Sequence, residues 1–181
     1  MQKTALTAAP VLPVIAERWS PRAYDETYEI TKHELLSILE AGRWAPSANN
    51  AQPWRFSVLT RGSELFEKVA AEGLSGFNQA WAPNASALIV VSIKTNNADG
   101  APNKYAPYDA GLSVANLVVQ AHELGLHTHQ MGGYLPDPIR SILELDEELS
   151  PIVVIAVGKV APAEKLEGPA FDREVAPRTR L

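Results

Sequence analysis

The stretch DAGLSVANLVVQAHEL, residues Asp109–Leu124, decides the fold of this 181-residue chain. Its spacing predicts a helix that Gly125 ends, with apolar side chains on almost every side. These apolar residues are Leu112, Val114, Ala115, Leu117, Val118, Val119, Ala121 and Leu124. A helix of this kind must be covered on most sides, either by the rest of its own domain or by a partner chain.

Further helices and strands are expected on both sides of this central helix. A capping box of Thr31 and Glu34 begins a helix that runs to about Trp44, and Pro46 stops it. Other helices are expected over residues 63–71 and 138–145, and strands over residues 55–60, 87–95, 126–131 and 152–160. Because helices and strands do not alternate strictly, the expected fold class is α+β.

The organisation of the chain indicates one domain. The sequence is 46% hydrophobic, and no repeat or linker divides it. Residues 1–13 read as a flexible N-terminal arm and residues 14–181 as the single domain. Within that domain, residues 161–181 form a polar, proline-containing stretch without apolar periodicity, and we expect an extended C-terminal arm.

Composition and charge exclude several classes of protein. A net charge of −5 and a pI of about 5.4 argue against nucleic-acid binding, which needs a basic surface. The absence of cysteine excludes disulfides, thiolate catalysis and cysteine-ligated metal. The longest apolar run, Ala87 to Ile93, is too short to span a bilayer, and the first residues do not resemble a secretion signal. We therefore expect a cytoplasmic protein that binds neither nucleic acid nor a membrane.

Arginines are concentrated near both ends of this acidic chain. Arg18, Ser20 and Arg22 alternate, so in an extended segment their side chains point to one side. Arg178 and Arg180 repeat the alternation near the C-terminus. A guanidinium group suits bidentate contact with phosphate. The pattern indicates a phosphate site, although two separately solvated basic ends would look the same.

Two irregular segments and one asparagine are further candidates. The segment from Pro46 to Trp54 holds two prolines and three amides, so it cannot be a regular helix or strand. Gly132 and Gly133 allow the backbone to approach a flat ligand closely, or simply form a turn. Asn78 precedes a buried strand and either binds a ligand or caps a turn.

Histidines raise the alternative of a metal site. His127 and His129 alternate on one predicted strand, and His122 lies near the end of the central helix. No carboxylate or further histidine completes a recognisable ligand set, so we expect no metal. Four tryptophans could stack on a ring, but Trp54 is expected to pack in the core.

Five motifs occur in one fixed order and together cover roughly residues 14–181. They are Arg-x-Ser-x-Arg, Pro-Ser-x-x-Asn-x-Gln-Pro-Trp, a small-residue central helix, Met-Gly-Gly-Tyr and a C-terminal Arg-x-Arg. This ordered set resembles the nitroreductase family of FMN-dependent oxidoreductases. The resemblance implies a sandwich with a central, mostly antiparallel sheet flanked by helices, in an intertwined homodimer. It also implies FMN as cofactor, NADH or NADPH as electron donor, and a ping-pong reduction of a nitroaromatic, quinone or similar small acceptor.

The resemblance also assigns roles to single residues, with the flavin itself carrying the chemistry. It implies that the segment Arg18, Trp19, Ser20 and Arg22 holds the phosphate and ribityl chain, with Arg178 and Arg180 completing the phosphate site. Pro46, Ser47 and Asn50 would reach the flavin from the other subunit. Asn78 would bond the pyrimidine edge, and the backbone of Gly132 and Gly133 would face flavin N5 and O4.

The chain departs from the family pattern at two places. Where many members have a long helical excursion, residues 96–108 are short and polar, so we expect a less covered flavin face. Where members often have a lysine after the asparagine, this chain has Trp81 or Ala82, which leaves the redox potential and the choice of nicotinamide open. A flavin-binding storage module and a flavin-dependent oxidase are the alternative functions.

Overall fold

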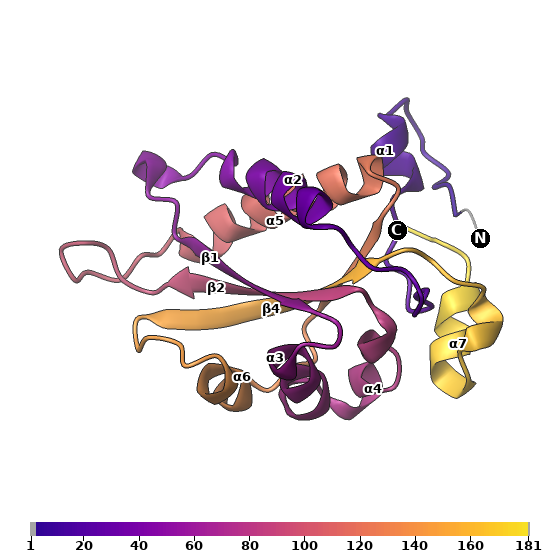
Figure 1. The fold of residues 1–181 in the computed structure, drawn as a ribbon. Coiled ribbons are helices and arrows are strands. Elements are labelled where there is room, and N and C mark those ends of the chain that lie inside the picture. Colours follow the sequence, from indigo (N-terminus) through magenta and orange to yellow (C-terminus); the bar gives the residue numbers. More distant parts are fainter. Residues whose placement is uncertain (1–2, 181) are drawn as a thin grey trace.

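A four-stranded sheet forms the centre of the computed structural model, which describes residues 3–180 (Figure 1). Its strands are β1 (Trp54–Thr60), β2 (Ala87–Lys94), β3 (His127–Met131) and β4 (Leu149–Gly158). They lie in the order β1-β2-β4-β3, and every neighbouring pair is antiparallel. Because β2 lies between two strands and under two helical layers, it is buried over almost its whole length.

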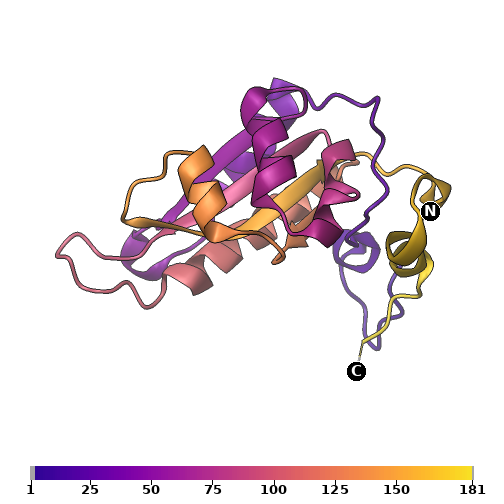
Figure 2. The same cartoon turned by 90° about the horizontal axis from the view of Figure 1, so that it is seen from below.

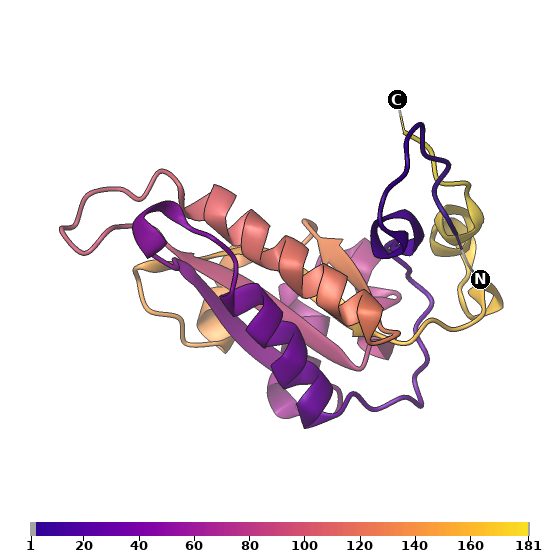
Figure 3. The same ribbon diagram turned by 90° about the horizontal axis from the view of Figure 1, so that it is seen from above.

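Helices cover both faces of the sheet. On one face lie α2 (Lys32–Arg43) and α5 (Ala106–Glu123), seen from above in Figure 3. On the other lie α3 (Glu64–Lys68), α4 (Gly76–Gln79) and α6 (Pro136–Ile142), seen from below in Figure 2. Alternate residues of β2 divide between the two cores, Ile89 and Val91 packing with α2 and α5, and Leu88 and Val90 with the helices opposite. This is the expected α+β sandwich.

Most of the predicted elements are confirmed to within a few residues. The Thr31 side chain accepts from the Glu34 backbone N–H, and the Glu34 carboxylate accepts from the Thr31 N–H, so the capping box is present. The central helix begins one turn earlier than expected, at Ala106, with Pro107 in its first turn, where no helical donor is needed. The helix after Ser63 ends at Lys68 and continues as a wider π turn over Val69–Gly73.

The predicted extended C-terminal arm is wrong over part of its length, since α7 (Gly168–Val175) lies within it. Ala170 and Phe171 of this helix pack on the main core, and Glu174 is almost completely buried. The tail therefore does have an apolar face. The described part of the predicted N-terminal arm likewise leads into a short helix, α1 (Pro13–Glu17), while residues 1, 2 and 181 lie outside the described residues. Short 3₁₀ turns are found at Ala48–Asn50, Ala82–Asn84 and Ala163–Lys165.

Candidate functional site

Three of the four candidate arginines line one cavity, beside the two chain ends. Arg18, Arg178 and Arg180 face a cavity of about 610 Å³ whose other wall is formed by residues 5–16. Within residues 3–180, none of these guanidiniums has a carboxylate within salt-bridge distance. Burial, and then the charges of Arg178 and Arg180, lower the pKa of Arg18. Converging cations without a carboxylate partner form a place where an anion is stabilised.

Arg22 does not join this group. Its guanidinium lies 4.0 Å from the buried carboxylate of Glu174 and over the ring of Phe77. The Glu174 carboxylate also accepts from the backbone N–H groups of Arg22 (2.8 Å) and Ala23 (3.2 Å). The role of Glu174 was not predicted from the sequence, because it depends on the helix α7, which no apolar periodicity indicated.

The segment from Arg18 to Arg22 is held against the edge strand β3 by two histidines. The buried ring of Trp19 packs edge-on against His127, with ring centroids 6.2 Å apart. His129 Nδ1 lies 2.8 Å from the carbonyl oxygen of Pro21, so the neutral tautomer with a proton on Nδ1 donates to it. Burial lowers the pKa of both histidines to about 4. They are therefore neutral supports of the arginine motif at pH 7, a role that alternation on a strand alone did not reveal.

Asn78, Gly132 and Gly133 lie together at the far end of β3. Asn78 Nδ2 donates to the Gly133 carbonyl oxygen (2.8 Å), which also accepts from the Ser75 backbone N–H (3.0 Å). A Cβ on Gly133 would lie 2.5 Å from Ser75 Oγ and 2.8 Å from Asn78 Nδ2, so a larger residue here would displace both side chains. A Cβ on Gly132 would meet nothing within 4 Å. The exposed backbone at Gly132 is therefore accessible to a ligand, and the side-chain oxygen of Asn78, free among the described residues, lies nearby as an acceptor.

The loop that holds Pro46, Ser47 and Asn50 has an unusual backbone. Asn49, Asn50 and Gln52 all have positive φ values, between 45° and 54°, which asparagine tolerates better than most residues. Ser47 Oγ accepts from the Gln52 backbone N–H, and the buried carboxylate of Asp109 accepts from the Ala48 N–H at 3.1 Å. Asp109 therefore ties this loop to the first turn of α5.

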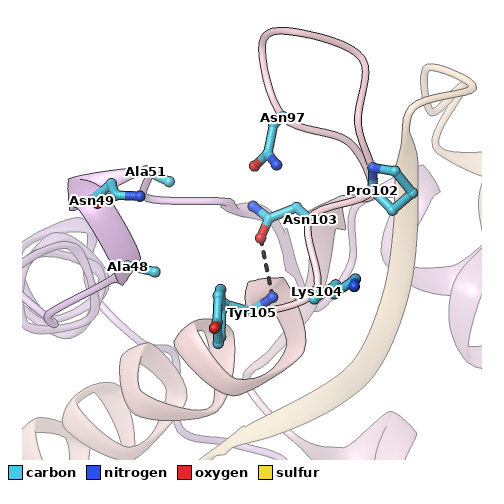
Figure 4. Close-up of a pocket in the computed structure, with 8 residues that line it drawn as sticks. All are labelled: Ala48, Asn49, Ala51, Asn97, Pro102, Asn103, Lys104 and Tyr105. Atoms are coloured by element: carbon cyan, nitrogen blue, oxygen red, sulfur yellow. Dashed lines mark hydrogen bonds between the residues drawn. The ribbon is translucent and has the colours of Figure 1, made fainter.

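A second cavity, of about 220 Å³, lies between this loop and the segment 97–105 (Figure 4). Ala48, Asn49 and Ala51 line one side. On the other side the backbone N–H of Tyr105 donates to Asn103 Oδ1 at 3.2 Å, which shapes the turn into α5 (Figure 4). The short polar interval 96–108 therefore lies beside the Pro46 loop.

The arginine motif and the Pro46 loop thus lie at opposite ends of α5. Asp109, in its first turn, holds the Pro46 loop, whereas His122, in its last turn, contacts His127 beside Trp19. His122 lies thirteen positions after Asp109 in the helix, which is roughly 20 Å at 1.5 Å per residue. Figure 1 shows the same separation, with the loops at one end of the sheet and both chain termini at the other. One chain does not bring all the candidates together.

Among residues 3–180 no group of three or more histidine, aspartate or glutamate side chains is arranged to hold a metal ion. No helix in that same range is both long and apolar enough to cross a membrane.

Comparison with known proteins identifies the family. The family model described as "Nitroreductase family" matches residues 15–159. A Bacillus subtilis protein, "Putative NAD(P)H nitroreductase YdgI", is 30% identical, the match covering 83% of this chain and 88% of that protein. The chain belongs to the nitroreductase family.

Solved structures agree over almost the whole chain. "The crystal structure of the oxidoreductase containing FMN" is 36% identical, with a TM-score of 0.90, and the match covers 98% of this chain and 91% of that one. A nitroreductase homologue from Exiguobacterium sibiricum, solved in complex with FMN, is 25% identical, with a TM-score of 0.78, and the match covers 98% and 96% of the two chains. The extent of these matches means that the arms at both termini belong to the common fold.

Proposed function

We propose that this protein is an FMN-dependent oxidoreductase that takes electrons from NADH or NADPH. The observation that carries the proposal is the cavity where Arg18, Arg178 and Arg180 converge without a carboxylate partner in the described chain. A phosphate monoester needs this arrangement of fixed cations. Membership of the nitroreductase family, and the FMN named in the titles of two structural neighbours, support FMN as the phosphorylated ligand.

The chain's own residues supply binding and orientation. Arg18, Arg178 and Arg180 hold the phosphate, Trp19 and Ser20 line the path of the ribityl chain, and Arg22 lies further along that path. Asn78, whose Nδ2 is already bonded to Gly133, offers its side-chain oxygen to the pyrimidine N–H of the ring. The backbone at Gly132 and Gly133 packs against the ring, as the open space over Gly132 allows. When bound, FMN supplies the hydride chemistry, so no side chain has to act as an acid or base.

The same proposal includes a homodimer. Pro46, Ser47 and Asn50 lie at the opposite end of α5 from the arginines, so they reach this flavin only from a second copy of the chain. Residues 14–181 then form one FMN-binding domain, and each flavin is held between two such domains. Exposed apolar side chains on α2 and α5, among them Leu36 and Val119, are available for the contact.

The acceptor is proposed to be a small nitroaromatic, a quinone or a similar molecule, reduced after the nicotinamide has left. In such a ping-pong exchange both substrates reach the same flavin in turn. The second cavity, between the Pro46 loop and residues 97–105, would then lie near the flavin of the partner subunit. Three asparagines, Lys104 and Tyr105 line it beside alanine and proline surface, which suits a small aromatic acceptor that carries polar groups.

Anaerobic titration of the purified protein tests the proposal. The protein, as purified or after addition of FMN, is expected to be yellow and to lose its flavin absorbance when NADH or NADPH is added. A quinone or nitroaromatic added next should restore the absorbance. Flavin that binds but does not bleach would indicate a storage module, and turnover with oxygen in the absence of nicotinamide would indicate an oxidase. Protein that takes up no FMN contradicts the proposal as a whole.

A further inference from the structure

The N-terminal strap, defined here as residues 3–16, is joined to the C-terminal tail by one arginine. Arg178 Nη1 donates to the backbone carbonyl oxygens of Lys3 and Ala16, both at 2.6 Å. The backbone N–H of Ala5 donates to the same Ala16 oxygen at 2.8 Å, so the strap closes on itself as a loop. Figure 3 shows this loop beside the tail that follows α7.

Lys3 fastens the strap from the other side. Its Nζ donates to the carbonyl oxygens of Glu174 and Ala176, the latter at 2.8 Å, and lies 4.8 Å above the ring of Trp19. These oxygens belong to the end of α7, where helix carbonyls lack partners and attract cations. One side chain therefore joins the strap, the tail and the Arg18–Arg22 motif.

The strap explains how three positively charged side chains stay close together in the arginine cavity. Three guanidiniums brought together repel one another, and burial together with Arg180 lowers the pKa of Arg178. Within residues 3–180 no carboxylate balances them, yet Arg178 stays beside Arg18. The two strap carbonyls are the neutral acceptors that fix it there, and its remaining N–H groups stay available to an anion.

We propose that the N-terminal strap is a specificity element that preorganises Arg178 for the flavin phosphate, and so favours FMN over unphosphorylated riboflavin. The inference rests on the proposed function for the identity of the ligand. Without the strap the tail would have to be ordered when the ligand binds, and this ordering would weaken binding. Because the strap lines the arginine cavity and not the surroundings of Gly132, ring binding is unaffected.

The test compares the full chain with a variant that lacks residues 2–9, both as apoprotein, in titrations with FMN and with riboflavin. Deletion is expected to raise the dissociation constant for FMN about tenfold, the cost of ordering one or two long side chains, and to leave riboflavin within about twofold. Lys3→Ala removes the side chain but keeps the Lys3 carbonyl, so it should raise the dissociation constant for FMN by a smaller factor than the deletion. Lys3→Arg keeps a cationic donor and should bind FMN almost as tightly as the full chain. An unchanged ratio of the FMN and riboflavin affinities in the deletion variant overturns the inference.

Limited trypsin digestion separates this inference from the proposed function. In the full-length apoprotein the strap should protect the bond after Arg178, which it holds through two hydrogen bonds, and deletion should accelerate cleavage there several-fold. Mass spectrometry of the released C-terminus measures this without any flavin. Equal cleavage rates would show that the strap does not hold the tail. Failure of the full chain to bind FMN, with protection intact, would instead contradict the proposed function.

Discussion

The two ends of α5 hold their candidate residues in different ways. At the arginine end, defined by Arg18, Arg178 and Arg180, the contacts join residues more than 150 positions apart, such as Arg178 with Ala16. At the loop end, defined by residues 46–54 and 96–105, most contacts are local, and one buried carboxylate, Asp109, anchors the loop. The arginine end gathers positive charges that can bind an anion, whereas the loop end presents polar groups to the outside. Under the proposed function, each end supplies part of a flavin site that two chains complete.

Removal of Arg178 and Arg180 should produce the largest effect, confined to the arginine end. Truncation after Pro177 removes two charge-assisted contacts, each worth about 1.5–3 kcal/mol, so the FMN dissociation constant should rise roughly 100-fold or more. Riboflavin binding should change far less, because it lacks the phosphate. The conservative control, Arg178→Lys with Arg180→Lys, retains both positive charges and should lose less FMN affinity than the truncation. Equal losses for the two flavins would mean that the tail shapes the protein and does not bind phosphate.

Acidification should lower the stability of the protein at the arginine end, because His129 becomes protonated. Its pKa of about 4 in the folded protein is below the ordinary 6.5, so its contribution to stability is complete above pH 6.5 and is lost as the pH falls towards 4. The part lost between pH 7 and pH 5 is about 2 kcal/mol. His129→Gln keeps a donor for the Pro21 carbonyl but does not titrate. Urea unfolding at both pH values should therefore show a smaller acid loss in this variant, while the exposed His33→Gln should behave as wild type. Identical pH dependence in all three proteins would contradict the burial of His129.

A matched pair of glycine substitutions sharpens the distinction between phosphate and ring. Gly133→Ala forces Ser75 and Asn78 to move and breaks the bond to the Gly133 carbonyl, which should cost at least about 1 kcal/mol of stability. Gly132→Ala places a methyl group in open space and should leave the unfolding free energy unchanged. It should nevertheless weaken FMN and riboflavin equally, unlike the tail truncation. Normal affinity for both flavins in Gly132→Ala would mean that the ring lies elsewhere.

Local patterns predicted much of this molecule because their causes are local. The Thr31–Glu34 capping box and the β2 strand depend on residues close in sequence, and both were found as expected. The helix α7 was missed because its buried face includes a carboxylate, Glu174, whose partners lie more than 150 residues earlier. His129 was missed for the same reason, since its acceptor is the Pro21 carbonyl. Arg22 is separated from the other arginines because it contacts Glu174, and the spacing of the arginine motif does not predict that contact.

The most direct test of the shared site combines two damaged chains in one dimer. Differently tagged chains allow a trans dimer, with the tail truncation on one chain and Ser47→Ala with Asn50→Ala on the other, and a cis dimer, with both changes on one chain beside a wild-type partner. If each flavin takes its arginines from one chain and its loop from the other, the trans dimer keeps one intact site. Half of its FMN sites should then titrate with wild-type affinity, and none in the cis dimer. Wild-type sites in the cis dimer and none in the trans dimer, or loop changes without effect on either, would contradict the account.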